Sequence, residues 1–225
     1  MNEYKYLYKY YDELLNDEEI LKQWINDSLL IKPSSILDLA CGSGNASIIY
    51  HDLGYNVTGI DLSESMIRYA QSKNPNIEYH ILNMINFNLN HTYDLVVCFM
   101  DSINYLTNIN DIKQTFINVY NHLNDKGLFM FDIHTLKCLE IYQQEYIEEG
   151  IVLDTEYQWT IISENKKLLS KFVFYNGDYK EDHTQYIYDP IDIEKLLNEI
   201  GFNVIIDKIN EEKYMFKAYK NTIIE

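Results

Sequence analysis

The feature that most constrains this chain is an apolar run that ends in two glycines, at residues 36–45 (Ile-Leu-Asp-Leu-Ala-Cys-Gly-Ser-Gly-Asn). Residues 36–40 suit a strand that is buried on both faces, and Gly42 and Gly44 then permit positive φ and let a ligand lie against bare backbone. Apolar side chains at helical spacing follow at once, so the N–H groups of a helix would point back into the loop. This order of elements predicts a site for a nucleotide-type ligand.

A second apolar run, residues 57–60, ends at Asp61, nineteen residues beyond Gly42. An acid at the end of a strand can accept two hydrogen bonds from a ribose diol, and the spacing fits a β-α-β unit. A dinucleotide site needs a third glycine behind the pyrophosphate, but Ser47 stands there and Asp38 lies inside the first strand. Both departures point away from NAD, and an NAD-dependent oxidoreductase is left as a competing hypothesis.

The segments Asp-Leu-Ala-Cys-Gly-Ser-Gly-Asn (38–45) and Gly-Ile-Asp-Leu-Ser-Glu-Ser-Met (59–66) closely resemble the first two motifs of class I S-adenosylmethionine-dependent methyltransferases. The resemblance is specific over about residues 11–132, and it is closest to bacterial enzymes that methylate amines or other groups on small metabolites. It implies S-adenosylmethionine as the cofactor and a small-molecule acceptor, with an amine favoured over a hydroxyl. The alternative is a non-catalytic methyltransferase-like binding or partner module, against which the intact glycines and Asp61 argue.

The expected fold is α/β, with a Rossmann-like, mostly parallel sheet of seven strands in which the last strand is antiparallel. Beyond the first β-α-β unit, strands are expected at residues 77–82, 93–99 and 128–133. Residues 202–209 and 213–220 flank a tight turn and should form an antiparallel pair at one edge, as the resemblance implies.

One domain is expected to span residues 1–225, with two additions to the sheet and its helices. The first is an N-terminal helical lid over residues 1–31, where aromatic residues recur at helical spacing. The resemblance implies that an aromatic ring of this lid covers the bound cofactor, with Tyr11 favoured over Trp24. The second addition is an antiparallel β insertion over residues 135–189, expected on the acceptor side of the cleft.

Within the insertion, residues 135–150 are expected to be helical, and a hairpin turn is expected at Asn176-Gly177. His183 lies on the opposite alternation from Tyr186 and Tyr188, so in a regular strand it cannot share their face. Because burying rings is the larger free-energy gain, we expect the aromatic residues to line the acceptor site and His183 to point outward. These aromatic residues are Tyr157, Trp159, Tyr186 and Tyr188.

The residues expected to bind the cofactor lie on the lid, in the glycine loop and at strand ends. In the family an Asp commonly stands where this chain has Asn83 and accepts a hydrogen bond from the adenine amino group, while the next N–H donates to the ring. The Asn83 amide oxygen can still accept such a bond. The complete expected set is Tyr11, Trp24, Asp38, Ala40, Cys41, Gly42, Gly44, Asp61, Leu62, Met66, Asn83, Met84, Cys98 and Phe99.

Methyl transfer from a sulfonium requires mainly the alignment of acceptor, methyl group and leaving sulfur, and such positioning can supply roughly 7 to 11 kcal/mol. A general base is needed only if the acceptor arrives protonated. The candidates are His134, His183, Asp101 and Tyr11, and the sequence does not choose among them. The fourth strand is not followed by the Asn-Pro-Pro-Tyr or Asp-Pro-Pro-Tyr pattern of enzymes that methylate DNA bases or glutamine, which again favours a small acceptor.

Composition excludes several partners. The net charge is −17 and Arg68 is the only arginine, so a nucleic-acid partner is not expected. Cys41, Cys98 and Cys138 form no Cys-x-x-Cys pair, which predicts neither a disulfide framework nor a metal site. No apolar run approaches the ~18 residues of a membrane span, and the N-terminus does not resemble a signal peptide, so a cytoplasmic protein is expected. The oligomeric state is left open.

Overall fold

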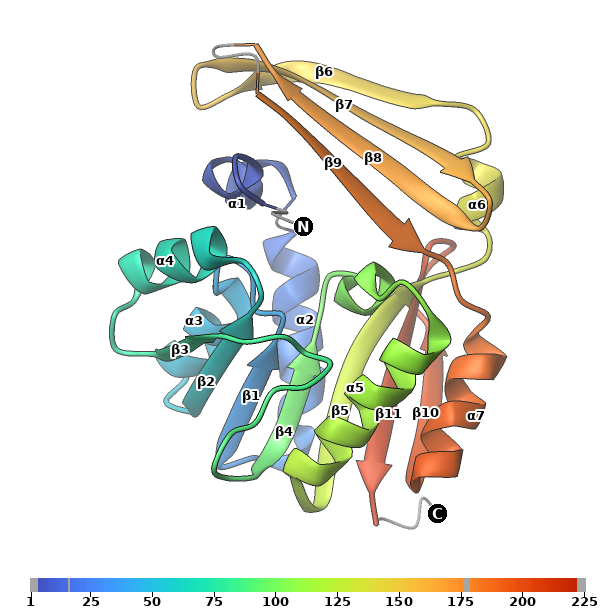
Figure 1. Ribbon diagram of the computed structural model, residues 1–225. Helices are drawn as coiled ribbons and strands as arrows, with labels where there is room; N and C mark the ends of the chain where they lie inside the picture. The colour runs from blue at the N-terminus through green and yellow to red at the C-terminus, as the bar shows by residue number, and fades with distance from the viewer. Residues whose placement is uncertain (1–3, 16, 176–178, 222–225) are drawn as a thin grey trace.

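The computed structural model describes residues 4–15, 17–175 and 179–221, and its centre is a seven-stranded sheet (Figure 1). All neighbouring strands pair in parallel except at one edge, where the last strand of the chain is antiparallel to both of its neighbours. The predicted Rossmann-like sheet is therefore confirmed. In sheet order the strands are β10 (Phe202–Lys208), β11 (Lys213–Lys220), β5 (Leu123–His134), β4 (Tyr93–Cys98), β1 (Ser35–Leu39), β2 (Asn56–Asp61) and β3 (Glu78–Ile81).

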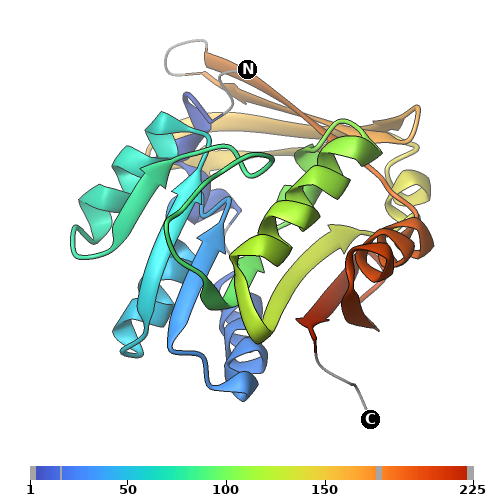
Figure 2. The same ribbon diagram turned by 60° about the horizontal axis from the view of Figure 1, so that its bottom comes forward.

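Helices cover both faces of this sheet, and each face has its own apolar core (Figures 1 and 2). The strands read as continuous apolar runs because neighbouring residues of one strand point into different cores: Ile36 of β1 belongs to one and Leu37 to the other. On the first face lie α2 (Glu18–Ser28), α3 (Asn45–Asp52) and α4 (Glu64–Lys73), and on the second lie α5 (Ile109–His122) and α7 (Pro190–Ile200).

The helix ends follow the local signals of the sequence. The Asp17 side chain accepts a hydrogen bond from the N–H of Ile20 and so caps α2, and Ser63 caps α4 in the same way. Helix α7 starts with Pro190 and is followed by Gly201 as its C-cap, whose φ of 114° lies in the region that favours glycine. These caps fix where each helix begins and ends relative to the sheet.

A separate four-stranded antiparallel sheet, here called the upper sheet, lies above the carboxyl edge of the central one (Figure 1). It comprises β6 (Tyr146–Val152), β7 (Thr155–Glu164), β8 (Lys167–Phe174) and β9 (Tyr179–Tyr186). The predicted turn at Asn176-Gly177 lies outside the described residues, but the strands on either side of it pair as a hairpin would.

The prediction that residues 135–150 are helical is wrong. Only α6 (Cys138–Ile141) is helical, and β6 takes up the second part of the range, paired with β7. The turn between them places Leu153 and Asp154 at φ 46° and 62°. Glycine or asparagine usually occupies such positions, so the hairpin carries no turn signal in the sequence.

The N-terminal segment, residues 4–15, lies between the upper sheet and α4 (Figure 1). It is less helical than predicted, with one 3₁₀ turn (Leu7–Lys9) and one short helix, α1 (Tyr11–Leu14). The carboxylate of Glu181 on β9 accepts hydrogen bonds of 2.9 Å from two backbone N–H groups of the 3₁₀ turn and its N-cap. The segment is thus fastened to the inner face of the upper sheet.

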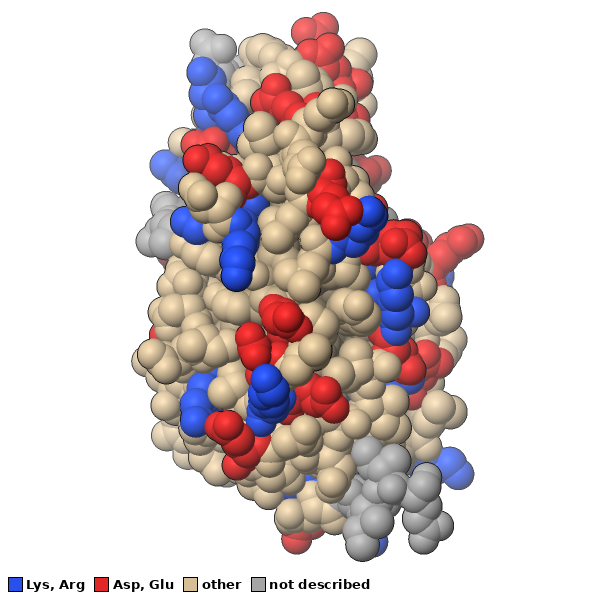
Figure 3. Space-filling view, turned by 90° about the vertical axis from the view of Figure 1, so that its right-hand side faces the viewer, with Lys and Arg blue, Asp and Glu red and all other residues tan. Residues whose placement is uncertain are grey.

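Acidic and basic side chains are interspersed on the face that carries α7, so the negative charge is not one large patch there (Figure 3). Ion pairs within α7 and between α7 and α5 account for part of this mixing, such as Lys195 with Asp192 and Lys113 with Glu199. Among the described residues, no helix is long and apolar enough to cross a bilayer.

Candidate active site

The glycine loop after β1 follows the path that its residues predict. Gly42 and Gly44 have φ values of 52° and 80°, in the left-handed region that favours glycine. A Cβ atom on Gly44 would lie 2.5 Å from the Tyr79 hydroxyl and 2.9 Å from Cβ of Ala70. Glycine is therefore required at Gly44 both by conformation and by the close approach of α4 and β3.

Asp61, at the end of β2, ties this loop to the next turn. One carboxylate oxygen accepts a hydrogen bond of 2.9 Å from the N–H of Gly42, and the other accepts one of 2.7 Å from the N–H of Ser63. Burial raises the pKa of Asp61, and these hydrogen bonds partly oppose that rise. A carboxylate has about four lone-pair sites, so the two bonds do not exhaust its capacity to accept from a ligand.

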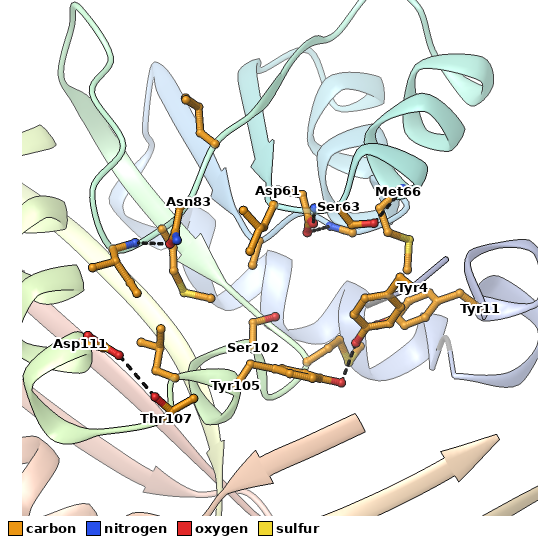
Figure 4. A pocket seen from close by; sticks show the side chains of 18 residues that line it. Tyr4, Tyr11, Asp61, Ser63, Met66, Asn83, Ser102, Tyr105, Thr107 and Asp111 are labelled. Atoms are coloured by element: carbon orange, nitrogen blue, oxygen red, sulfur yellow. Dashed lines mark hydrogen bonds between the residues drawn. The ribbon is translucent and has the colours of Figure 1, made fainter. Parts of the chain in front are cut away.

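A cavity of about 280 Å³ opens beside Asp61, at the carboxyl edge of the central sheet (Figure 4). The N-terminal segment, the glycine loop, the β2–α4 turn, the segment after β3 and the segment between β4 and α5 all contribute to it. The lining residues are Tyr4, Tyr11, Ala40, Gly42, Asp61, Leu62, Ser63, Met66, Leu82, Asn83, Met84, Ile85, Met100, Ser102, Tyr105, Leu106, Thr107 and Asp111.

A second cavity of about 40 Å³ adjoins the first, and residues such as Tyr11 and Gly42 line both. Asp38 lines this smaller cavity from β1, and the Ser47 hydroxyl donates a hydrogen bond of 2.6 Å to it. Burial raises the pKa of Asp38 to about 7, although the bonds from Ser47 lower it. The smaller cavity therefore holds a carboxyl group that titrates near neutral pH.

The N-terminal segment is also fastened to the glycine loop, through Asp12. Its carboxylate accepts hydrogen bonds from the Ser43 hydroxyl at 2.5 Å and the Asn45 amide at 2.9 Å, and it pairs with Lys73 of α4 at 2.5 Å. The side chains of both partners in this ion pair are about four-fifths buried. Tyr11, next in the chain, is thereby held against both cavities.

A family model described as "Methyltransferase domain" matches residues 36–127, which run from β1 into β5. The relative named "Putative methyltransferase YqeM", from Bacillus subtilis (strain 168), is 31% identical over an alignment of 240 positions. The alignment covers 95% of this chain and 96% of the relative. The chain belongs to the class I S-adenosylmethionine-dependent methyltransferases. S-adenosylmethionine is its methyl donor.

Solved structures share this methyltransferase fold over nearly the whole chain. An S-adenosylmethionine-dependent methyltransferase from Clostridium acetobutylicum ATCC 824 is 25% identical, covers 94% of this chain and 96% of its own, and has a TM-score of 0.80. The sugar N-methyltransferase KedS8 from Streptoalloteichus sp ATCC 53650 shares the fold at 15% identity, with 95% and 92% covered and a TM-score of 0.81. Homologues of this chain include both N- and O-methyltransferases.

Most residues that the sequence predicts for the cofactor meet at these two cavities of the methyltransferase. Asp38, Cys41 and Phe99 line the smaller one, whereas Gly44 lines neither and acts through the loop geometry described above. The residues that line the larger cavity are Tyr11, Ala40, Gly42, Asp61, Leu62, Met66, Asn83 and Met84.

Two predicted contacts are not supported. Trp24 is buried in the core between α2 and the sheet, with its ring 5.5 Å from that of Phe99, and it lines neither cavity. Cys98 points into the opposite core and is fully buried. An apolar residue at a strand end or on a helical stripe can face a core as readily as a ligand, so its position in the sequence does not separate the two roles.

The sequence missed more than half of the lining residues of the larger cavity. Tyr4 and Tyr105 come from segments about a hundred positions apart, and their hydroxyls lie 2.7 Å from each other (Figure 4). Asp111, in the first turn of α5, looked like an ordinary surface acid. Some of the missed residues carried a signal: Ser63 as a helix cap, Tyr4 in the aromatic stripe of the N-terminal region, and Met100, Ser102 and Tyr105 after the fourth strand, at the edge where ligands bind. The other missed residues are Leu82, Ile85, Met100, Ser102, Leu106 and Thr107.

Two base candidates, Asp101 and His134, belong to a buried charge cluster beside the cavities and line neither of them. Nζ of Lys213 lies 2.5 Å from Asp101 and 3.0 Å from Asp132. Burial alone would raise the pKa of Asp101, but His134 and Lys213 bring it down to about 2. Met100 and Asp101 both have positive φ. The cluster therefore supports a strained loop whose neighbouring residues face the cavity.

The prediction that His183 points outward and that the aromatic residues line the cleft is wrong. His183 points inward, is 3% exposed and lies with Nδ1 3.3 Å from the Tyr105 hydroxyl. The aromatic residues of the insertion line neither cavity. Tyr157 packs instead against Leu7 of the N-terminal segment, and Tyr188 lies beyond β9 and donates to the backbone of Leu106. The N-terminal segment covers the face that these rings were expected to turn toward the cleft.

Proposed function

We propose that this methyltransferase transfers the methyl group of S-adenosylmethionine to a small-molecule amine. The observation that carries the proposal is the charge of the larger cavity. Of the described residues that line it, Asp61 and Asp111 are acidic and none is basic. Three tyrosines and three methionines also line it, and aromatic rings interact favourably with a cation. A cavity of this kind attracts an ammonium group and repels a carboxylate acceptor.

The lining residues fit the methyl donor. Asp61 would accept from the ribose hydroxyls with its remaining lone pairs, and Asn83 with Met84 would receive the adenine edge. In the smaller cavity, Asp38 would face the ammonium group of the methionyl part. When bound, the donor supplies a methyl group on a positively charged sulfur.

The protein contributes positioning and the exclusion of water. Tyr11, held through Asp12, would cover the donor, and the N-terminal segment with the upper sheet would close the acceptor side as parts of one domain. Holding two reactants in register can supply roughly 7 to 11 kcal/mol, because their relative motion is already restricted before reaction. In this arrangement the donor would lie on the glycine-loop side of the cavity and the acceptor on the tyrosine side.

The names of the relatives include both nitrogen and oxygen acceptors. One, from Saccharopolyspora spinosa, is named dTDP-4-amino-2,3,4,6-tetradeoxy-D-glucose N,N-dimethyltransferase and is 26% identical over 46% of this chain. Another, from Bacillus anthracis, is named malonyl-[acyl-carrier protein] O-methyltransferase and is 27% identical over 80% of it. The two names differ in the acceptor atom, so the charge of the cavity is the observation that favours nitrogen.

The test begins with calorimetry using S-adenosylmethionine, S-adenosylhomocysteine and NAD, of which we expect the first two to bind. Release of S-adenosylhomocysteine is then measured with matched acceptors: 2-phenylethylamine, 2-phenylethanol and phenylacetate, and glucosamine, glucose and glucuronate. We expect turnover with amine members. Turnover confined to the hydroxyl or carboxylate members, or donor binding with no amine methylated, would reject the proposed acceptor class.

A further inference from the structure

A chain of polar groups runs from β9 to the cavity, and the donor site does not use it. Glu181 and His183 both point toward the N-terminal segment and are 7% and 3% exposed. Nε2 of His183 lies 3.2 Å from Oε1 of Glu181, and Nδ1 lies 3.3 Å from the Tyr105 hydroxyl. That hydroxyl is 2.7 Å from the hydroxyl of Tyr4, and both tyrosines line the larger cavity.

We propose that Tyr105 takes the proton from the acceptor amine, while His183 receives the phenol proton and Glu181 stabilises the imidazolium that results. The inference rests on the proposed function, since an amine that arrives as an ammonium ion must lose a proton before its nitrogen can attack. Tyr105 is the catalytic residue in this scheme, and His183 and Glu181 are positioning residues that act through it.

The surroundings assign the protons of this relay. Glu181 accepts two backbone N–H groups, and although burial acts to raise its pKa, His183 and those bonds lower it, so it is a carboxylate. A carboxylate beside Nε2 favours the tautomer with hydrogen on Nε2, so that Nδ1 can accept from Tyr105. Nε2 and Oε1 lie close without aligned hydrogen-bond geometry, and their contact becomes an ion pair only when His183 is protonated. Catalytic contacts are often looser before the substrate binds.

The residues of the N-terminal segment and of β8 that lie against His183 carry no charge. Tyr4 of the N-terminal segment has its ring 4.7 Å away, and burial raises the pKa of Tyr4 well above the usual range, so it remains a phenol. It can therefore donate to the Tyr105 oxygen. From β8, Phe172 and Ser170 face or pair with His183, and neither carries charge. Glu181 is thus the charged group in direct contact.

The step balances. The ammonium proton moves to the Tyr105 oxygen as the Tyr105 proton moves to Nδ1 of His183, and the amine is left with a lone pair. That pair forms the bond to the methyl carbon, and the electrons of the methyl–sulfur bond leave with sulfur. The proton held on His183 returns to solvent between turnovers, so no other reactant is consumed.

The first test compares Tyr105→Phe with Tyr157→Phe, a matched loss of a phenol that donates to Glu148 in the upper sheet and lines neither cavity. The acceptor is 2-phenylethylamine. At pH 7 we expect kcat/KM of Tyr105→Phe to be about 100-fold lower than that of the wild type, within the usual range for general base catalysis. The defect should shrink about tenfold per pH unit, because an amine with a pKa of roughly 10 is increasingly deprotonated in solution. Tyr157→Phe should match the wild type. An equal loss by Tyr105→Phe at every pH would overturn the relay.

The second test reads His183 without any acceptor, so it separates failure of the relay from failure of the proposed function. Nitrogen NMR of histidine side chains is recorded on the whole protein saturated with S-adenosylhomocysteine. At pH 7.5 we expect His183 to be neutral, with hydrogen on Nε2, and its Nδ1 resonance to move in Tyr105→Phe but not in Tyr157→Phe. A charged His183, or hydrogen on Nδ1, would overturn the relay even if amines are methylated. The expected spectrum with no amine turnover would reject the acceptor class alone.

Discussion

The two walls of the larger cavity are built in different ways. The wall that we propose for the donor, here called the donor wall, contains Gly42 and Asp61 at the ends of neighbouring parallel strands. Hydrogen bonds from the N–H groups of Gly42 and Ser63 to the Asp61 carboxylate hold it in place. The opposite wall, which we propose for the acceptor and here call the acceptor wall, brings Tyr4 and Tyr105 together with His183 behind them. These residues come from three distant parts of the chain. The first wall is fixed by local geometry, whereas the second depends on long-range packing.

The largest effect that we expect falls on the donor wall, at Asp61. Replacing Asp61 with Ala removes the acceptor of two backbone N–H groups and the proposed ribose contacts, and hydrogen bonds to charged groups contribute about 1.5 to 3 kcal/mol each. We expect the Kd for S-adenosylmethionine to rise at least about 100-fold by calorimetry, with a folded protein by circular dichroism.

Asp111→Ala is the matched control, because it removes the other carboxylate of the cavity without touching the loop. Its Kd should change much less. If Asp61→Ala binds the donor as tightly as the wild type does, Asp61 does not contact the ribose, and the donor does not bind beside the glycine loop.

The next effect is a pH dependence on the same wall. Since burial raises the pKa of Asp38 to about 7, the free protein binds a proton there below neutral pH. An ammonium group facing Asp38 would require the carboxylate, so donor binding releases that proton. Affinity should therefore rise with pH and level off above about 7, and we expect roughly 30-fold weaker binding at pH 5.5 than at pH 8.

The control for this prediction is Asp38→Asn, in which the slope should disappear. Asp132 also has its pKa raised to about 7, mainly by burial, but it lines neither cavity. A slope that persists in Asp38→Asn would assign the linked proton to Asp132 or another group, and would remove Asp38 from the donor site.

The donor wall could be predicted from sequence because its signals are local. Gly42, Gly44 and Asp61 take their roles from the ends of two adjacent strands, and the spacing alone sets their geometry. The caps of α4 and α7 follow for the same reason, since each depends on residues within one turn. Such features are determined before the chain packs.

The acceptor wall could not be predicted because its contacts form only on folding. Nothing near Tyr105 in sequence shows that His183 will meet its hydroxyl. The aromatic stripe of the N-terminal region does not show which ring reaches the cavity, and Tyr4 reaches it where Trp24 does not. Strand β6 was missed because its turn has no glycine.

A smaller effect tests the connection between the two walls. Asp12→Ala removes the group that fastens the N-terminal segment to the glycine loop, through Ser43, Asn45 and Lys73. We expect about tenfold weaker donor binding, with most of the change in the dissociation rate, because Tyr11 is no longer held over the donor. Glu13→Ala, an exposed acid next in the chain, should leave binding unchanged. Equal effects of the two variants would mean that the segment does not cover the donor.

The smallest effect is expected at Asn83, where the donor wall departs from the commoner family residue. Its side-chain oxygen accepts a hydrogen bond of 2.9 Å from the N–H of Ile85, and the carboxylate introduced by Asn83→Asp could accept the same bond while receiving the adenine amino group more strongly. We expect the Kd for S-adenosylmethionine to stay within about threefold of the wild type, on the tighter side. Asn83→Leu, which can accept neither bond, should weaken binding about tenfold. A large loss in Asn83→Asp would place this side chain away from the adenine, and the donor wall would then be less strictly set by local sequence than its glycine loop indicates.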